Sequence, residues 1–335
     1  MGADSVLVTG GAGFVGSELV TQLISDGHRV VVLDNLQNGR RVNLAALPDE
    51  SYNLVVGDVR DAGVLAAVMS KVSTVFHLAC LGLRHSLHAP QANHDVNVIG
   101  TLTVLNAARA AGVHRFVHVS SSEVYGSARW VPMSEDHPTE PSTVYGATKL
   151  AGESYARAFH RTYGLPVVIV RPFNAFGPRC HHEGDSGEVI PRFLLRALAG
   201  GPLIVFGDGE QTRDFTFVTD TARGIRLAAT TDAAIGETVN LGSGRELTVN
   251  ELARTIKEIA GRSDTPITRD APRPGDVRRM CADSRRAQQL LRFAPTVDFE
   301  EGLSRTLNWY RSLDVPAARL LEAESVHNWL GPGEV

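Results

Sequence analysis

The chain has 335 residues, of which 43% are hydrophobic and 21% charged, and its formal net charge is −4. This length and balance are typical of one large or two modest folded domains, and they exclude a disordered or collagen-like chain. Because 33 basic residues stand against 37 acidic ones, a protein that binds nucleic acid through its phosphates is disfavoured as well.

Short β-branched runs alternate with helix-length segments along the first half of the chain. Strands are predicted at 6–8, 30–33, 54–56, 75–78, 116–119 and 167–170, and helices at 14–25, 62–70, 92–111 and 145–163. Such alternation is typical of βαβ units. It predicts an α/β fold with a Rossmann-like, doubly wound parallel sheet that takes in everything to about residue 172.

The second half of the chain has a looser pattern. Helices are predicted at 190–198, 219–229 and 249–260 with short strands between them, and loops at 174–188 and 266–276. We therefore expect a first domain at 1–172, a smaller C-terminal α/β lobe at 173–312 and a tail at 313–335. The tail has a helical pattern but carries no functional signal.

A glycine-rich turn joins the first strand to the first helix. Gly10, Gly13 and Gly16 follow the spacing Gly-x-x-Gly-x-x-Gly. Such a turn lets backbone N–H groups at the helix N-terminus approach a pyrophosphate, and the last glycine lets the helix pack closely on the sheet. The context predicts a dinucleotide site.

Two carboxylates end the next two strands. Asp34, after the second strand, is placed to bind ribose hydroxyls and to repel a 2′-phosphate, so NAD is favoured over NADP. The nearby Arg40 and Arg41 keep NADP open. Asp58, after the third strand, either meets the adenine or caps the following helix.

A tyrosine and a lysine lie four residues apart near the start of a predicted helix. Tyr145 and Lys149 therefore share one helix face, while Ser121, Ser122 and Glu123 follow the fifth strand at the sheet edge where doubly wound folds bind ligands. For Tyr145 to act as a base, its pKa must fall from about 10 to near neutrality, which corresponds to about 4 kcal/mol. A nearby lysine and a cationic nicotinamide would supply this.

At this point the sequence resembles the extended short-chain dehydrogenases/reductases of the nucleotide-sugar epimerase/dehydratase family. Beyond the glycine turn and the Tyr145–Lys149 helix, the resemblance rests on His77-Leu-Ala79, Asn97-Val-Ile-Gly-Thr101, Arg171-Pro-Phe-Asn174, Gln211-Thr-Arg-Asp214 and Arg273-Pro-Gly-Asp276. It extends to about residue 312. It implies an NAD-binding domain at 1–172, a lobe at 173–312 that mainly binds the nucleotide sugar, and a homodimer in which helices 92–111 and 145–163 pair across a two-fold axis.

The resemblance also implies three sets of site residues. The catalytic residues would be Ser121, Ser122, Glu123, Tyr145 and Lys149. The residues that bind the cofactor would be Gly10, Gly13, Phe14, Val15, Gly16, Asp34, Asn35, Asp58, Val59, Leu78, Ala79, Tyr145 and Lys149. The substrate, a UDP-, dTDP- or GDP-hexose, would be bound by Ser86, Asn174, Val189, Arg213 and Arg273; structural ion pairs are the alternative for the two arginines.

The fate of a shared intermediate would decide the activity. Tyr145 would take the proton of the sugar's carbon-4 hydroxyl as hydride moves to NAD, which leaves a 4-keto sugar. Glu123 favours 4,6-dehydration, since it resembles the glutamate of dehydratases and decarboxylases. Ser121 is commoner in 4-epimerases, which remain the second reading, and UDP-glucuronate decarboxylation is the third.

Two readings outside this group remain open: a nucleotide-binding interaction protein that has lost its chemistry, and a simple dehydrogenase that releases NADH. We expect no metal site, because the adjacent residues Cys180-His181-His182-Glu183 cannot easily surround one tetrahedral ion. Cys80, Cys180 and Cys281 are widely spaced, which disfavours disulfides. With no signal peptide and no membrane-length apolar run, a cytoplasmic protein without membrane association is expected.

Overall fold

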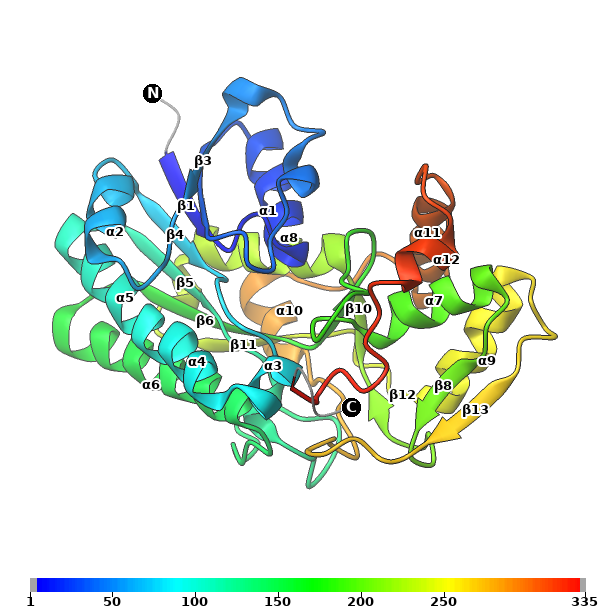
Figure 1. Ribbon diagram of the computed structural model, residues 1–335. Helices are drawn as coiled ribbons and strands as arrows, with labels where there is room; N and C mark the ends of the chain where they lie inside the picture. The colour runs from blue at the N-terminus through cyan, green and yellow to red at the C-terminus, as the bar shows by residue number, and fades with distance from the viewer. Residues whose placement is uncertain (1–4, 332–335) are drawn as a thin grey trace.

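Seven parallel strands form the central sheet of the computed structural model, which describes residues 5–331 (Figure 1). Their order is β11-β6-β5-β4-β1-β2-β3. The strands are β1 (Ser5–Thr9), β2 (Arg29–Asp34), β3 (Tyr52–Val56), β4 (Thr74–His77), β5 (Arg115–Val119), β6 (Val167–Pro172) and β11 (Thr238–Leu241). The chain order reverses between β1 and β4, and such a switch point opens a crevice at the carboxyl ends of the strands. The predicted Rossmann-like sheet is confirmed.

Alternating strand residues build a separate core on each face of the sheet. In β1, Val6 and Val8 join one cluster and Leu7 joins the other, as the two-residue period of a strand requires. The first face is covered by α1 (Phe14–Ser25), α8 (Val218–Thr230) and α10 (Arg285–Leu291), and the second by α2 (Ala62–Met69), α5 (Gly100–Ala111) and α6 (Val144–Tyr163). The sheet is therefore buried on both sides, as parallel sheets are.

The predicted helix at 92–111 is interrupted by a short π-helix. The chain after β4 forms α3 (Leu83–His88), α4 (Pro90–His94) and the π-helix η3 (Asp95–Ile99), which leads directly into α5. Single π-helical turns occur often at functional sites, and this one places Asn97 in the interior.

The smaller lobe packs around its own apolar cluster. Its elements are β7 (Asn174–Phe176), α7 (Val189–Ala199), β8 (Leu203–Phe206), β9 (Thr212–Arg213), β10 (Phe215–Phe217), β12 (Leu247–Thr248), α9 (Val249–Ala260), β13 (Ile267–Asp270), α11 (Phe299–Arg311) and α12 (Ala317–Leu321). Short 3₁₀ turns lie at η1 (Arg41–Leu44), η2 (Asp49–Ser51), η4 (Ser122–Tyr125) and η5 (Asp232–Ala234). Edge-to-face contacts of Phe176 with Phe215 and Phe217 lie in the centre of this cluster.

Two expectations about the second half need correction. The sheet does not end at residue 172, because β11 pairs with β6 and α8 packs beside α1 on the first face (Figure 1). The loop expected at 266–276 begins as a strand, since Ile267–Asp270 pair in parallel with β8. Some elements that follow residue 172, such as β11 and α8, therefore belong to the larger lobe.

None of the helices within residues 5–331 combines the length and the apolar character that crossing a membrane requires.

Candidate active site

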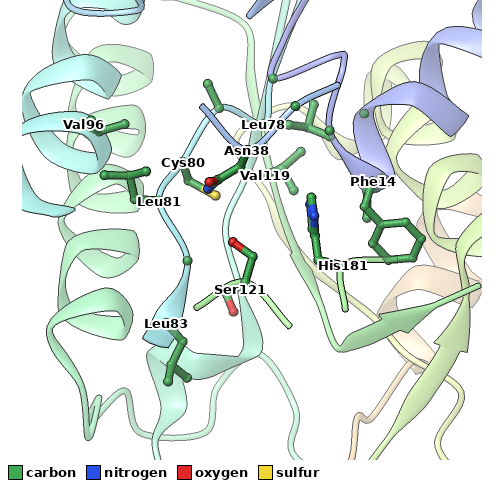
Figure 2. Close-up of a pocket in the computed structure, with 18 of the residues that line it drawn as sticks. Phe14, Asn38, Leu78, Cys80, Leu81, Leu83, Val96, Val119, Ser121 and His181 are labelled. Carbon is green, nitrogen blue, oxygen red and sulfur yellow. The ribbon is translucent and has the colours of Figure 1, made fainter. Parts of the chain in front are cut away.

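A cavity of about 350 Å³ opens at the carboxyl ends of β1, β2, β4 and β5, and we call it the first cavity. Figure 2 shows Phe14 and His181 on one side of it, with Cys80 and Ser121 facing them. Its wall contains most of the predicted cofactor residues. They are Gly10, Gly13, Phe14, Val15, Gly16, Asp34, Asn35, Val59, Leu78, Ala79, Tyr145 and Lys149.

The glycine turn leaves space that no larger residue could leave. A Cβ atom on Gly10, whose φ is +72°, would lie 2.8 Å from the backbone nitrogen of Ala79, and one on Gly16 would lie 2.1 Å from the carbonyl oxygen of Gly10. No side chain caps the start of α1 at Gly13, so the N–H groups of its first turn are available to an anion. This cradle fits a dinucleotide pyrophosphate.

The Asp34 carboxylate is held on the cavity wall by the backbone. It accepts hydrogen bonds from the N–H groups of Ala12, at 3.0 Å, and Leu36, at 2.9 Å. Burial raises the pKa of Asp34, and these two bonds oppose the rise. The neighbouring Arg40 forms an ion pair with Glu183 at 2.6 Å.

Asp58 lies beside the first cavity but is not part of its wall. Its carboxylate binds the Arg60 guanidinium at 2.8 Å, which lowers the pKa of Asp58 to about 2. The cap of α2 is Asp61, so the cap alternative for Asp58 is wrong. Its contact with adenine stays a prediction, supported by the 3.4 Å hydrogen bond that it accepts from Asn35 on the wall.

Helix α6 brings Tyr145 and Lys149 to the end of β5. Lys149 Nζ donates a 2.7 Å hydrogen bond to the carbonyl of Val119, the last residue of that strand. Burial and the nearby Cys80 raise the pKa of Tyr145 well above its usual value, while a hydrogen bond with Ser121 opposes the rise. The tyrosine, the lysine and the serine are therefore assembled as predicted on one wall.

Glu123 is buried with one carboxylate oxygen lacking a hydrogen-bond partner among the described residues. It lines a second cavity of about 190 Å³, together with Ser121, Ser122 and Tyr145. Burial raises the pKa of Glu123, and the positive charge of Arg213 opposes the rise. An ionisable group in this setting is suited to proton transfer.

The π-helix orients the loop that forms the cavity wall after β4. Asn97 accepts a hydrogen bond from the N–H of Leu81 at 2.8 Å and donates to its carbonyl at 3.0 Å and to Thr148 of α6 at 3.1 Å. His77 is hydrogen-bonded to Thr9 at 2.8 Å, and burial lowers its pKa well below the usual value, so its ring is neutral. These contacts join β1, β4 and α6.

Four of the five predicted substrate residues line two cavities that share part of their walls. Asn174, Arg213 and Arg273 lie on the second cavity and, with Val189, on a third cavity of about 80 Å³. Arg213 forms an ion pair with Asp276, in line with the structural alternative. Burial lowers the pKa of Arg273 to about 9, so it stays charged at neutral pH.

Ser86, the fifth predicted substrate residue, does not reach any of the three cavities. Its hydroxyl is buried and donates to the carbonyl of Leu83 at 2.6 Å, inside the turn of α3. The predicted substrate residues do not include the neighbouring Arg84, although it lines all three cavities. Its guanidinium donates two hydrogen bonds of 3.0 Å to the Glu188 carboxylate. Glu188 precedes α7, and only its position just before an apolar helix could have marked it.

Ion pairs and contacts around Glu183 hold the loop Cys180–Glu183. Glu183 contacts Arg40, His181 and His182, while burial raises the pKa of the Cys180 thiol well above its usual value. Within residues 5–331 no set of three His, Cys, Asp or Glu side chains is arranged to hold a metal ion.

The fold, the glycine cradle and the Ser121–Tyr145–Lys149 wall define a dinucleotide-dependent enzyme of the short-chain dehydrogenase/reductase class. The family model of GDP-mannose 4,6 dehydratase matches residues 7–306. The chain belongs to the nucleotide-sugar epimerase/dehydratase family of extended short-chain dehydrogenases/reductases.

Relatives in this family carry different activities. A UDP-glucose 4-epimerase of Mycolicibacterium smegmatis is 39% identical over 312 residues, covering 91% of this chain and 98% of that protein. UDP-glucuronic acid decarboxylase 1 of Xenopus tropicalis is 36% identical over 313 residues, covering 91% and 72%. The crystal structure of a dTDP-glucose 4,6-dehydratase from Streptomyces venezuelae with NAD bound has a TM-score of 0.87 at 39% identity, covering 92% of this chain and 97% of that one.

Proposed function

We propose that this protein is an NAD-dependent 4,6-dehydratase of a nucleotide-activated hexose. NAD-dependent modification of nucleotide sugars is common to the family, and the cradle at Gly10 and Gly16 fits this cofactor. The observation that carries the finer assignment is the buried, unpartnered carboxylate oxygen of Glu123 on the cavity that Tyr145 also lines. An epimerase needs no such group, because its reaction breaks no bond at carbon 5.

Tyr145 performs the first proton transfer. It takes the proton from the carbon-4 hydroxyl, and Ser121 holds the same oxygen by a hydrogen bond. Bound NAD would supply the hydride acceptor for carbon 4 and the hydride that is later returned, to carbon 6 in a dehydratase or to carbon 4 in an epimerase. Lys149 adds a positive charge at the start of the same helix, which lowers the cost of the phenolate.

Glu123 performs the elimination. The ketone at carbon 4 acidifies the hydrogen on carbon 5, and Glu123 takes that proton. The electron pair left behind forms the double bond to carbon 6 as the bond from carbon 6 to its hydroxyl breaks, and the Glu123 carboxyl protonates the leaving hydroxyl as water. Because burial raises the pKa of Glu123, one carboxyl group serves as base and then as acid. A proton from solvent then adds to carbon 5 as hydride returns to carbon 6, and Tyr145 releases to solvent the proton that it took from the carbon-4 hydroxyl.

A 4-epimerase is the second candidate. Ser121 favours it, since a serine at this position is commoner in 4-epimerases. In this reading Glu123 only supports the loop. Decarboxylation of a nucleotide-activated glucuronate ranks third, because Cys80–Ser86 does not resemble the corresponding segment of those enzymes.

Mass spectrometry of products formed in heavy water distinguishes the candidates. The purified protein is incubated with UDP-, dTDP- and GDP-hexoses and with UDP-glucuronate. Loss of one water with deuterium gained at carbon 5 is expected. A product of unchanged mass without deuterium would mean an epimerase, and loss of carbon dioxide from the glucuronate a decarboxylase. Stoichiometric NADH release, or no turnover of any substrate, would contradict all three.

A further inference from the structure

The chain after α12 returns toward the larger lobe and contributes Glu324 to the wall of the third cavity. Figure 1 shows this segment, in red, running from the smaller lobe toward α3 at the junction of the two lobes. It follows the part of the chain that the family model matches, which ends at residue 306. We call residues 324–329 the C-terminal strap.

The strap is firmly seated in the smaller lobe. Asn328 is buried and donates a 3.0 Å hydrogen bond to the carbonyl of Gly187, next to the start of α7. His327 binds Asp270 of β13 at 2.9 Å. The strap is thus part of the folded lobe.

Glu324 enters the third cavity and pairs with two of its arginines. Its carboxylate lies 2.5 Å from Arg192 Nε and 2.8 Å from the Arg196 guanidinium, and only 6% of its side chain is exposed. Arg192 also donates to the carbonyl of Val326 at 3.1 Å. Both arginines are therefore paired with the strap through one shared carboxylate.

Arg273 differs from the other arginines of this cavity. Five arginines line it: Arg84, Arg192, Arg196, Arg213 and Arg273. Glu188 pairs with the first, Glu324 with the next two and Asp276 with the fourth, whereas Arg273 forms no ion pair within 4.0 Å among the described residues. Its Nε is buried without a hydrogen-bond partner in the same part of the chain.

Two aromatic rings hold the Arg273 guanidinium. Its Cζ lies 5.2 Å from the ring centre of Phe206 and 5.4 Å from that of Trp329. Both distances lie within the range of a cation–π contact. The two rings also meet edge to face at 4.9 Å, so the strap supplies one side of the clamp.

We propose that the C-terminal strap is part of the nucleotide-sugar site, with Trp329 as a positioning residue that holds Arg273 toward the diphosphate of the substrate and Glu324 as the residue that removes Arg192 and Arg196 as competing anion sites. The inference rests on the substrate class of the proposed function and adds a specificity element to it. Because Arg273 is the one arginine of this cavity without an ion pair among the described residues, it fixes where a diphosphate binds. The position of the diphosphate in turn decides which nucleoside fits against Val189 and Phe206.

The test compares three substitutions by steady-state kinetics and by calorimetric binding of UDP, dTDP and GDP. Trp329→Leu keeps apolar bulk but removes the π face, and Trp329→Phe keeps a ring. Trp130→Leu is the matched control, because Trp130 is 51% exposed and lines none of the three cavities. NAD content and melting temperature are measured for each protein.

We expect Trp329→Leu to raise KM and the Kd of the preferred nucleoside diphosphate about three- to thirtyfold with kcat and NAD content unchanged. Trp329→Phe should restore most of the affinity, and Trp130→Leu should change neither constant. Unchanged affinity in Trp329→Leu would overturn the inference, and tighter binding would overturn it by showing that the strap competes with the substrate. If the unaltered protein binds none of these nucleotides, the proposed function itself fails.

Discussion

The phenol of Tyr145 is the group on which every proposed reaction depends. In the structure, burial and Cys80 raise its pKa, so the charge needed to form a phenolate must come from Lys149 and the bound cofactor. We expect Tyr145→Phe to lower turnover by about 10²–10⁴-fold, the usual contribution of a general base. Retained NAD, measured in the denatured protein by chromatography, should be unchanged. A variant with normal turnover would move the base elsewhere.

Glu123 couples function to a cost in stability. Since its folded-state pKa is raised, the ionised carboxylate destabilises the fold above that pKa, and the penalty shrinks as pH falls through it. We expect Glu123→Gln to raise the melting temperature at pH 7–8 and to lose this gain in acid. Dehydration should fall by about 10²–10⁴-fold.

The fall of activity at acid pH is a second test of the role of Glu123. If Glu123 is the base, activity falls at a pH above the ordinary glutamate value of about 4.3. Full dehydration activity in Glu123→Gln would refute the role of Glu123 as base. An equal melting temperature for the unaltered protein and Glu123→Gln at neutral pH would refute its raised pKa.

The site residues that could be predicted are those whose position follows from the neighbouring sequence alone. Gly10, Gly16 and Asp34 lie at a strand–helix turn and a strand end, so the sequence itself places them. The predicted substrate contact of Ser86 has no geometric support, because its hydroxyl donates to the carbonyl of Leu83 within one helical turn. Glu324 could not be found, because its partners Arg192 and Arg196 are more than a hundred residues away.

Helix α6 is anchored to the sheet by one buried carboxylate. Glu153 accepts hydrogen bonds from Ser120 at 2.6 Å and from Arg171 of β6 at 2.6 and 2.8 Å. Burial alone would raise its pKa, but Arg171 and Ser120 hold it below the usual value. The same helix carries Tyr145, so this contact sets where the catalytic face lies.

We expect Glu153→Gln to lower the free energy of unfolding by about 3–5 kcal/mol, because Arg171 is left buried without its counter-charge. As the pKa of Glu153 is lowered on folding, the carboxylate stabilises the protein above its unfolded-state pKa, and this stabilisation is lost as pH falls through the folded-state value. Urea denaturation measures it. Glu301→Gln, at an exposed i, i+4 pair with Arg305, is the control and should cost less than about 1 kcal/mol.

Local patterns were sufficient for helices such as α1 and α9, whose observed bounds match the predicted ones. They were insufficient for β11, because four residues between glycine-containing loops give little periodicity and the partner strand β6 is distant in sequence. The π-helix could not be predicted either, because one extra residue in a turn leaves the apolar pattern of a helix nearly unchanged.

For the molecule as a whole we predict a homodimer through α4–α5 and α6. Ile99 on the π-helix and Tyr163 at the end of α6 are 44% and 52% exposed although apolar or aromatic. Light scattering should give twice the mass of one chain, and Ile99→Glu should shift the protein toward the monomer. A single-chain mass for the unaltered protein at micromolar concentration would disprove this arrangement.

The pairing of β11 with β6 has a consequence for biosynthesis. Until residues 238–241 leave the ribosome, β6 is an edge strand whose free N–H and C=O groups can pair with another nascent chain. The cofactor half is thus finished only after much of the substrate half has been made. A fragment that stops at residue 172 should therefore aggregate on expression, although it carries every glycine of the cradle and the whole catalytic helix.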